Sequence, residues 1–391
     1  MIITLHALLS PFSHVYGNTE TMNLYSSSEE ILKEVSQYSE NSVDIQGFFE
    51  EVQKYSNEYF PELADENYLQ NLIQGNQNIE NQNLLNKILN VLIGEFQSNI
   101  SLILKIVGIA ILCSILKSIQ LNFGDNGVGE IAFYMCYLMV VTLIVTSFTS
   151  VVYLCTDTIK QLSNFMNMVI PLIFALMAVT GSITSISFLQ PFILGMIALI
   201  SFLLNRFIVP IIYLATIIQI VTNISKQITL DKIAELLKKT SLWVMEISLL
   251  IFGGVLSLEG TLAASVDGMT TKIAKNVVSS TIPVVGKILG DTVDSVIGGI
   301  AITKNAIGFI GILAILAITI SPLIKSLITM LVFNLSAAFI EPIADSRISK
   351  CMNSMAGSLK IIVGIMAVVI FIFIIAITMM LKISNTTLMY R

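Results

Sequence analysis

Long apolar segments recur along the chain after residue 98, and several are long enough to cross a lipid bilayer. A membrane-spanning helix needs about 20 apolar residues, because each residue adds about 1.5 Å and the hydrocarbon core is about 30 Å thick. Segments 100–120, 131–154 and 361–381 meet this requirement. Only 12% of the 391 residues are charged, and mean hydropathy is +0.84. We therefore expect an all-α, polytopic integral membrane protein with about seven transmembrane helices.

Charge divides the chain into two parts. Residues 18–95 contain 14 acidic residues and only three lysines, a formal charge of −11, whereas residues 96–391 carry a formal charge of +6. The first part is rich in Asn, Gln and Ser and contains two short amphipathic helical patterns. We predict that residues 18–97 form an acidic, helical, extracytoplasmic segment and that residues 98–391 form the multi-span membrane domain. The acidic segment either lies on the membrane surface or a partner, or forms a loosely ordered tether.

The first 17 residues, MIITLHALLSPFSHVYG, resemble the remainder of a secretory signal. They are apolar, contain a helix-breaking Pro11, and end at the small residue Gly17. No Lys or Arg precedes Lys33, so the basic region of a typical signal is missing and the signal is expected to be trimmed. The alternative is a short apolar N-terminus that directs nothing. A signal would place residues 18–97 outside the cytoplasm.

The middle of the membrane domain allows more than one helix count and contains two competing basic loops. Segment 168–224 is too long for one span, and we expect breaks near Gly181, Pro191 and Arg206. The basic amphipathic segment 226–243 is the best candidate for a cytoplasmic loop. Residues 272–287 form a second basic loop, so the positive-inside rule leaves the orientation open.

Residues suited to enzyme chemistry are sparse. The two histidines, His6 and His14, both lie in the predicted signal, and the four cysteines have no spacing that suits zinc. The Gly-Lys pair in VVGKIL lacks the upstream glycine and the following Ser or Thr of a phosphate-binding loop. We therefore predict a non-enzymatic protein with no catalytic residues, no metal site and no cofactor.

Two membrane segments share a proline-bounded pattern. PLIFALMAVTGSITSISFLQP (171–191) and PLIKSLITMLVFNLSAAFIEP (322–342) have seven identities at a constant offset of 151 residues. Many transporters contain internal repeats whose Pro- or Gly-interrupted segments line the binding site, although chance similarity between two apolar segments is an alternative. Ionisable residues at membrane depth are costly and suggest function. The candidates for a transport path or gate are Gln190, Pro191, Glu341, Pro342, Lys325, Glu246 and Glu259.

The region 280–311 is glycine-rich and apolar, yet it carries several charges. As a helix it would be short, broken by glycines and amphipathic, which favours a re-entrant or interfacial element over a full span. The alternative is a surface helix that links two spans. The candidate residues of this element are Gly286, Lys287, Asp291, Asp294 and Lys304.

Four motifs resemble one known family. The stretches IPVVGKILGDTVDSV, TKNAIGFIG, PLIK and AAFIEP are similar to the stage III sporulation protein AE family of endospore-forming Firmicutes. The resemblance covers about residues 95–391 in order. It implies a multi-pass protein of the mother-cell-derived outer forespore membrane, within a channel or secretion complex that connects mother cell and forespore after engulfment.

The same resemblance implies protein partners and no nucleic acid. Expected partners are the other membrane proteins of the stage III sporulation A operon, a cytoplasmic secretion-type ATPase (protein AA), the ring-forming protein AG and the forespore protein Q. The missing nucleotide motif agrees with an ATPase on a separate chain. The alternative function is a secondary transporter that acts alone. The transported substrate, its direction and the number of copies stay open.

Overall fold

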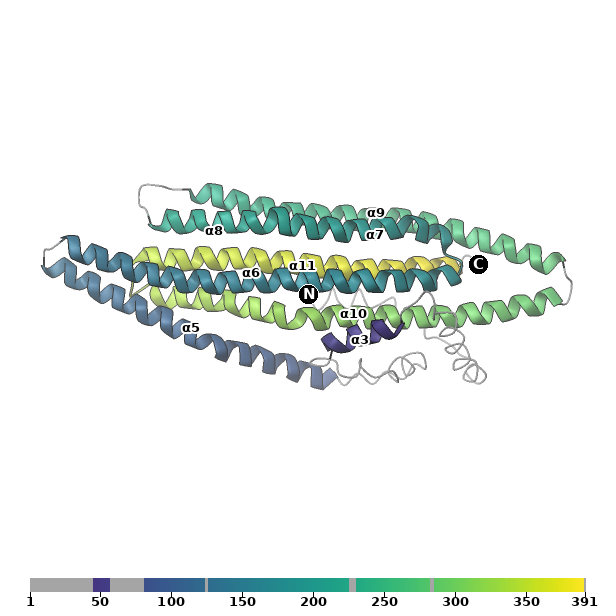
Figure 1. The fold of residues 1–391 in the computed structure, drawn as a ribbon, viewed down its shortest axis with the longest axis horizontal. Coiled ribbons are helices and arrows are strands. Elements are labelled where there is room, and N and C mark those ends of the chain that lie inside the picture. Colours follow the sequence, from purple (N-terminus) through teal and green to yellow (C-terminus); the bar gives the residue numbers. More distant parts are fainter. Residues whose placement is uncertain (1–44, 57–80, 124–125, 225–229, 282–284, 390–391) are drawn as a thin grey trace.

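The computed structural model describes residues 45–56, 81–123, 126–224, 230–281 and 285–389. The predicted signal and most of the acidic segment lie outside these residues. Six of the described helices are long and apolar enough to cross a membrane, which confirms an all-helical, polytopic membrane protein. Figure 1 shows them as an elongated bundle. The helices are α3 (Ile45–Ser56), α5 (Asn81–Phe123), α6 (Asn126–Val179), α7 (Ile183–Leu203), the π-helical turn η2 (Leu204–Ile208), α8 (Val209–Ile224), α9 (Asp231–Thr281), α10 (Val285–Ile340) and α11 (Ser346–Met389).

The long helices alternate in direction, so their connections gather at two ends (Figure 1). One end contains the turn between α10 and α11, the last residues of α5 and the start of α9, and we call it the α10–α11 end. At the other, the α6–α7 end, lie the turn between α6 and α7, the start of α10 and the C-terminal turn of α11. Helices α7, η2 and α8 run on as one apolar span, Ile183–Asn223.

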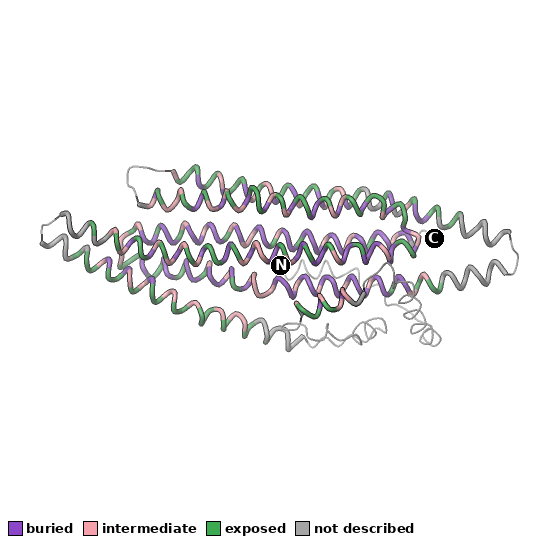
Figure 2. The backbone as a smooth tube through the Cα atoms, viewed as in Figure 1, coloured by how far each residue is buried: buried purple, intermediate pink, exposed green. Residues whose placement is uncertain are grey.

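Helices α10 and α11 form the centre of the bundle, where buried residues are densest (Figure 2). They approach closely because α10 carries glycines on the facing side. A Cβ atom at Gly308 would lie 2.5 Å from Leu381 Cδ1, and one at Gly311 would lie 3.3 Å from Ile377 Cδ1. Both glycines belong to the motif TKNAIGFIG, so this part of the sequence makes a helix–helix contact that a larger residue would disturb.

Helix α3 packs against α6 and α10. Its Phe48 and Val52 are fully buried, and the Phe48 ring lies 6.3 Å from the Phe165 ring, centroid to centroid. Its opposite face is polar: Lys54 Nζ lies 3.3 Å from a Glu51 carboxylate oxygen, and this hydrogen bond raises the pKa of Lys54. Helix α3 is therefore amphipathic.

The two proline-bounded segments do not share one structure. In segment 171–191 the chain turns at Gly181, which has a φ of 86°. The equivalent position in segment 322–342 is Val332, a β-branched residue that disfavours positive φ, and α10 runs through it without a turn. The expected break at Gly181 is confirmed. A break at Pro191 does not occur, because α7 continues through it, and Arg206 lies in the π-helical turn η2.

Region 280–311 is largely part of α10 rather than a separate short helix. Helix α10 is continuous from Val285 to Ile340, so its glycines do not break it. Gly286, Lys287, Asp291 and Asp294 lie in its first turns, and their side chains are outside the described set. An interfacial position for these four residues stays a prediction.

Candidate functional site: buried charges at the two ends of the bundle

The residues predicted to line a transport path do not converge within one chain. Gln190, Pro191 and Lys325 are exposed, as are Glu246, Glu341 and Pro342, and the Glu259 side chain is not described. Gln190 lies in α7 near the α6–α7 end, whereas Glu341 follows α10 at the opposite end. These two polar residues therefore do not meet inside the single chain.

Three charged side chains are buried among the described residues: Lys238, Asp267 and Lys304. Burying a charge is costly unless hydrogen bonds compensate, so such residues mark sites of structural or functional importance. Lys304 was already a candidate from the sequence, whereas the other two were missed. The three residues lie in two separate polar groups, one at each end of the bundle.

The Lys238 cluster consists of Gln219, Asn223, Lys238 and Ser354, near the α10–α11 end. Lys238 Nζ donates hydrogen bonds to Gln219 Oε1 and to the Ser354 carbonyl oxygen, the latter at 3.1 Å. Asn223 Nδ2 donates to Ser354 Oγ at 3.4 Å. One buried ammonium group thus joins α8, α9 and α11.

Asp267 of α9 caps the start of α7 at the opposite end. Its two carboxylate oxygens accept the backbone N–H groups of Thr184 and Ser185, each at 2.8 Å. The first N–H groups of a helix have no partner within the helix, and a negative charge there also interacts favourably with the helix dipole. Asp267 therefore ties α7 to α9 and fixes the tight α6–α7 turn.

Lys304 of α10 is fully buried at the same end. Its Nζ donates to Asn385 Oδ1 of α11 at 3.1 Å, and no ion pair to it exists among the described residues. The close approach at Gly308, one turn along α10, brings the lysine against α11. Next to Asn385, Ser384 Oγ lies 3.3 Å from Thr180 Oγ1 at the end of α6.

These contacts gather at the α6–α7 end in a polar layer, which we call the Asp267–Lys304 layer. It contains atoms that lack hydrogen-bond partners: Ser182 Oγ and Ser185 Oγ, in side chains with 0% exposure. Buried polar atoms without partners are rare, and each one requires a physical explanation such as strain or an alternative arrangement. The layer consists of Thr180, Ser182, Ser185, Asp267, Lys304, Ser384 and Asn385.

A signal for Lys238 was present in the sequence. It lies four residues after Ala234 and seven before Met245, both fully buried, so it belongs to the apolar face of α9. The neighbouring Lys239 pairs with Glu235 on the exposed face. Segment 226–243 is basic as a whole, so its composition does not separate the buried Lys238 from the exposed Lys239. No comparable pattern singled out Asp267.

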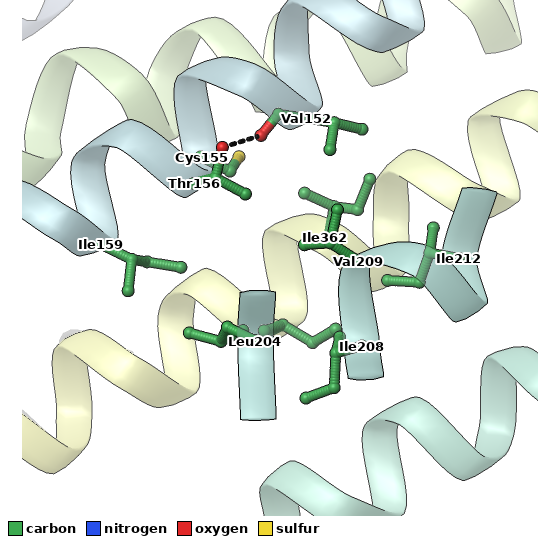
Figure 3. A pocket seen from close by; sticks show the side chains of 10 residues that line it. Val152, Cys155, Thr156, Ile159, Leu204, Ile208, Val209, Ile212 and Ile362 are labelled. Carbon is green, nitrogen blue, oxygen red and sulfur yellow. Dashed lines mark hydrogen bonds between the residues drawn. The ribbon is translucent and has the colours of Figure 1, made fainter. Parts of the chain in front are cut away.

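An apolar cavity of about 20 Å³ lies between α6, the η2–α8 region and α11 (Figure 3). It has room for about one water molecule but offers it almost no polar partner, so it is not a substrate chamber. The lining residues are Val152, Cys155, Thr156, Ile159, Leu204, Ile208, Val209, Ile212, Ile362 and Ile365.

Comparison with known proteins gives one family. The family model described as stage III sporulation protein AE matches residues 64–384. The stage III sporulation protein AE of Bacillus subtilis (strain 168) is 28% identical over 375 residues, which cover 96% of this chain and 94% of that protein. No solved structure matches.

Proposed function

Because the chain belongs to the stage III sporulation protein AE family, we propose that it is a non-enzymatic membrane component of the channel or secretion complex between mother cell and forespore. Membership of the family supports a role in sporulation. The observation that carries the proposal is the match along nearly the whole chain, which includes all six apolar helices in whole or large part. We place the protein in the mother-cell-derived outer forespore membrane.

The position of the acidic segment supports one orientation. Exposed Lys232, Lys239 and Lys350 lie near the α10–α11 end, together with Arg347. Helix α3 and the start of α5, which belong to the strongly acidic part of the chain, lie away from that end. Basic residues favour the cytoplasmic side. Lys272 of α9 and Lys287 of α10 lie at the opposite end, so basic residues alone do not decide the orientation. We assign the α10–α11 end to the mother-cell cytoplasm because a signal sequence would place the acidic segment in the space between the membranes.

Partners complete the proposed machine. The sequence has no phosphate-binding loop, so energy from ATP would come from a separate cytoplasmic ATPase, protein AA. The other membrane proteins of the same operon, ring protein AG and forespore protein Q are the further proposed partners. The basic α10–α11 end is the surface that a cytoplasmic partner would meet.

A secondary transporter that acts alone is the second candidate. It would need a substrate site within the bundle, where Gln190 and Glu341 were expected to contribute. They lie near opposite ends of the chain's bundle, and the cavity beside η2 is apolar and holds about one water. These observations favour a component of a larger complex over an independent permease.

Deletion of the gene in its native host tests the proposal. We expect engulfment to finish and development to stop afterwards, with a small or collapsing forespore and a loss of heat-resistant spores. Restoring the gene from another locus should restore spore counts. Normal sporulation after deletion, in a strain with no second copy of the family, would contradict the proposal. Substrate flux by the purified chain in vesicles would instead support the transporter.

A further inference from the structure

Helix α7 has a second candidate cap residue at its start. Ser182 is its N-cap residue, and the side chain of an N-cap serine normally accepts a backbone N–H from the second or third helical residue. Here these residues are Thr184 and Ser185, and Asp267 accepts both of their N–H groups. The Ser182 side chain makes no capping bond, and its Oγ is buried without a partner. Ser182 would take over this role once its backbone, at φ −87° and ψ 46° in the state described here, rotates to the extended conformation of a typical N-cap residue.

Lys304 has a neutral partner although a carboxylate is buried in the same layer. Its hydrogen bond goes to the Asn385 amide oxygen, and an ionised oxygen would bind an ammonium group more strongly. Asp267 is the buried acidic side chain of the described residues. The C-terminal turn of α11, which carries Ser384 and Asn385, packs against neighbours at the α6–α7 end and lies between α9 and α10 in the view of Figure 1.

We propose that the Asp267–Lys304 layer is a two-state latch. In the state described here, Asp267 caps α7, Lys304 binds Asn385, and Ser182 Oγ makes no hydrogen bond. In the second state, Ser182 caps α7 and Asp267 pairs with Lys304, after the C-terminal turn of α11 has moved out from between them. Such switches move helices by about 1–2 Å or, in the largest cases, by about one helical turn.

The latch accounts for the unpartnered hydroxyl at the cap. Ser182 has no bond in the first state and replaces Asp267 as the cap in the second. The start of α7 is therefore capped in both states. Movement of the carboxylate exchanges two hydrogen bonds from backbone N–H groups for one to Ser182 and an ion pair with Lys304, so the two states can lie close in free energy.

The hydroxyl of Thr180 also stays satisfied when the turn of α11 moves. In the first state, Thr180 Oγ1 lies near Ser384 Oγ and donates to the Met177 carbonyl oxygen at 2.8 Å. The bond to Met177 lies within one turn at the end of α6, so it does not depend on α11. The latch therefore couples the end of α11 to the α6–α7 turn without exposing a new unpartnered group on α6.

The test uses the full-length chain in detergent micelles and follows hydrogen–deuterium exchange of the Thr184 and Ser185 amides. In the wild type Asp267 caps both amides in the first state and Ser182 caps one of them in the second, so at least one amide exchanges slowly. In Ser182→Ala the second state has no cap, so we expect exchange at least fivefold faster. Adding Lys304→Gln removes the attraction that favours the second state and should return exchange to within twofold of the wild-type rate.

Asn385→Asp is a second substitution that should suppress the fast exchange of Ser182→Ala, because it gives Lys304 a carboxylate partner in the first state. It serves the same purpose if Lys304→Gln does not fold. Ser187→Ala is the matched control, since Ser187 is exposed on the same helix and donates to the Ile183 carbonyl oxygen of its own helix.

A static layer gives the opposite results. Ser182→Ala would then be silent, because its hydroxyl makes no hydrogen bond in the state described here. Wild-type exchange in Ser182→Ala, or fast exchange that persists with both suppressors, would overturn the latch. The readout needs only the purified chain, so it is independent of the proposed function.

Discussion

The two ends of the bundle each bury a lysine against a neutral side-chain amide, but they differ in how completely their polar groups are satisfied. Lys238 binds Gln219 and a backbone carbonyl, and no buried side-chain atom of its described cluster lacks a partner. Lys304 binds Asn385, while Ser182 and Ser185 in the same layer have hydroxyls without partners.

This difference separates an anchor from a device that changes state. A fully satisfied buried network is rigid, because any movement breaks a hydrogen bond without replacing it. The Asp267–Lys304 layer has a second arrangement available, because Ser182 can cap α7 in place of Asp267 and Asp267 can then pair with Lys304. We therefore expect the Lys238 cluster to hold α8, α9 and α11 together, and the Asp267–Lys304 layer to move.

The largest expected effect comes from removing each lysine's amide partner. Gln219→Leu leaves a buried ammonium with one bond fewer and should lower the free energy of unfolding by about 2–4 kcal/mol. Asn385→Leu should cost about half as much or less, because Asp267 can replace the lost partner. Denaturant unfolding in micelles measures both. Equal losses would remove the distinction between the two ends.

The next effect tests the close contact that places Lys304 on α11. Gly308→Val would drive its side chain into Leu381 and should cost about 1–3 kcal/mol of stability. Gly298→Val on the same helix is the matched control, because a Cβ there meets nothing within 4 Å. Thermal unfolding of both variants is the measurement, and similar melting temperatures would contradict the packing described for α10 and α11.

A smaller effect tests the second cap. Asp267→Ala should cost about 1 kcal/mol, the usual loss of a helix cap, because Ser182 can then cap α7. Combining it with Ser182→Ala leaves no cap and should cost about 1 kcal/mol more than the sum of the single variants. Additive losses in this double-mutant cycle would show that Ser182 does not replace Asp267.

The smallest effect tests whether burial, rather than charge alone, explains the contribution of the Lys238 cluster to stability. Glu235 and Lys239 form an exposed ion pair at 2.9 Å beside Lys238. Exposed pairs of this kind contribute little. Glu235→Gln should therefore leave the melting temperature unchanged within error, and a loss comparable to that of Gln219→Leu would be inconsistent with this view.

The fold class could be predicted well because apolar segments of membrane-spanning length have few alternatives to helices. The breaks were overestimated: α7 continues through Pro191 and α10 through its glycines, since packing against neighbours supports those helices. Gly181 was identified correctly, because its positive φ favours glycine.

The candidate site was harder to predict than the fold. Lys304 stood out as a charge in an apolar motif, but its partner Asn385 is 81 residues away. Asp267 and Ser182 are brought to the same place by the packing of α9 on α7, which no local pattern specifies. The exposed Gln190 and Glu341 were chosen from a sequence similarity, and the two segments that carry it differ in structure.

The most direct test compares two substitutions that each give a buried lysine a carboxylate partner. Asn385→Asp and Gln219→Glu should both be produced at normal levels in the native host, and heat-resistant spores are then counted. If the α6–α7 end must change state, Asn385→Asp lowers the count at least about tenfold, because a carboxylate holds Lys304 in the first state, while Gln219→Glu stays near wild type. Wild-type counts from Asn385→Asp, or equal losses from both variants, would contradict this account.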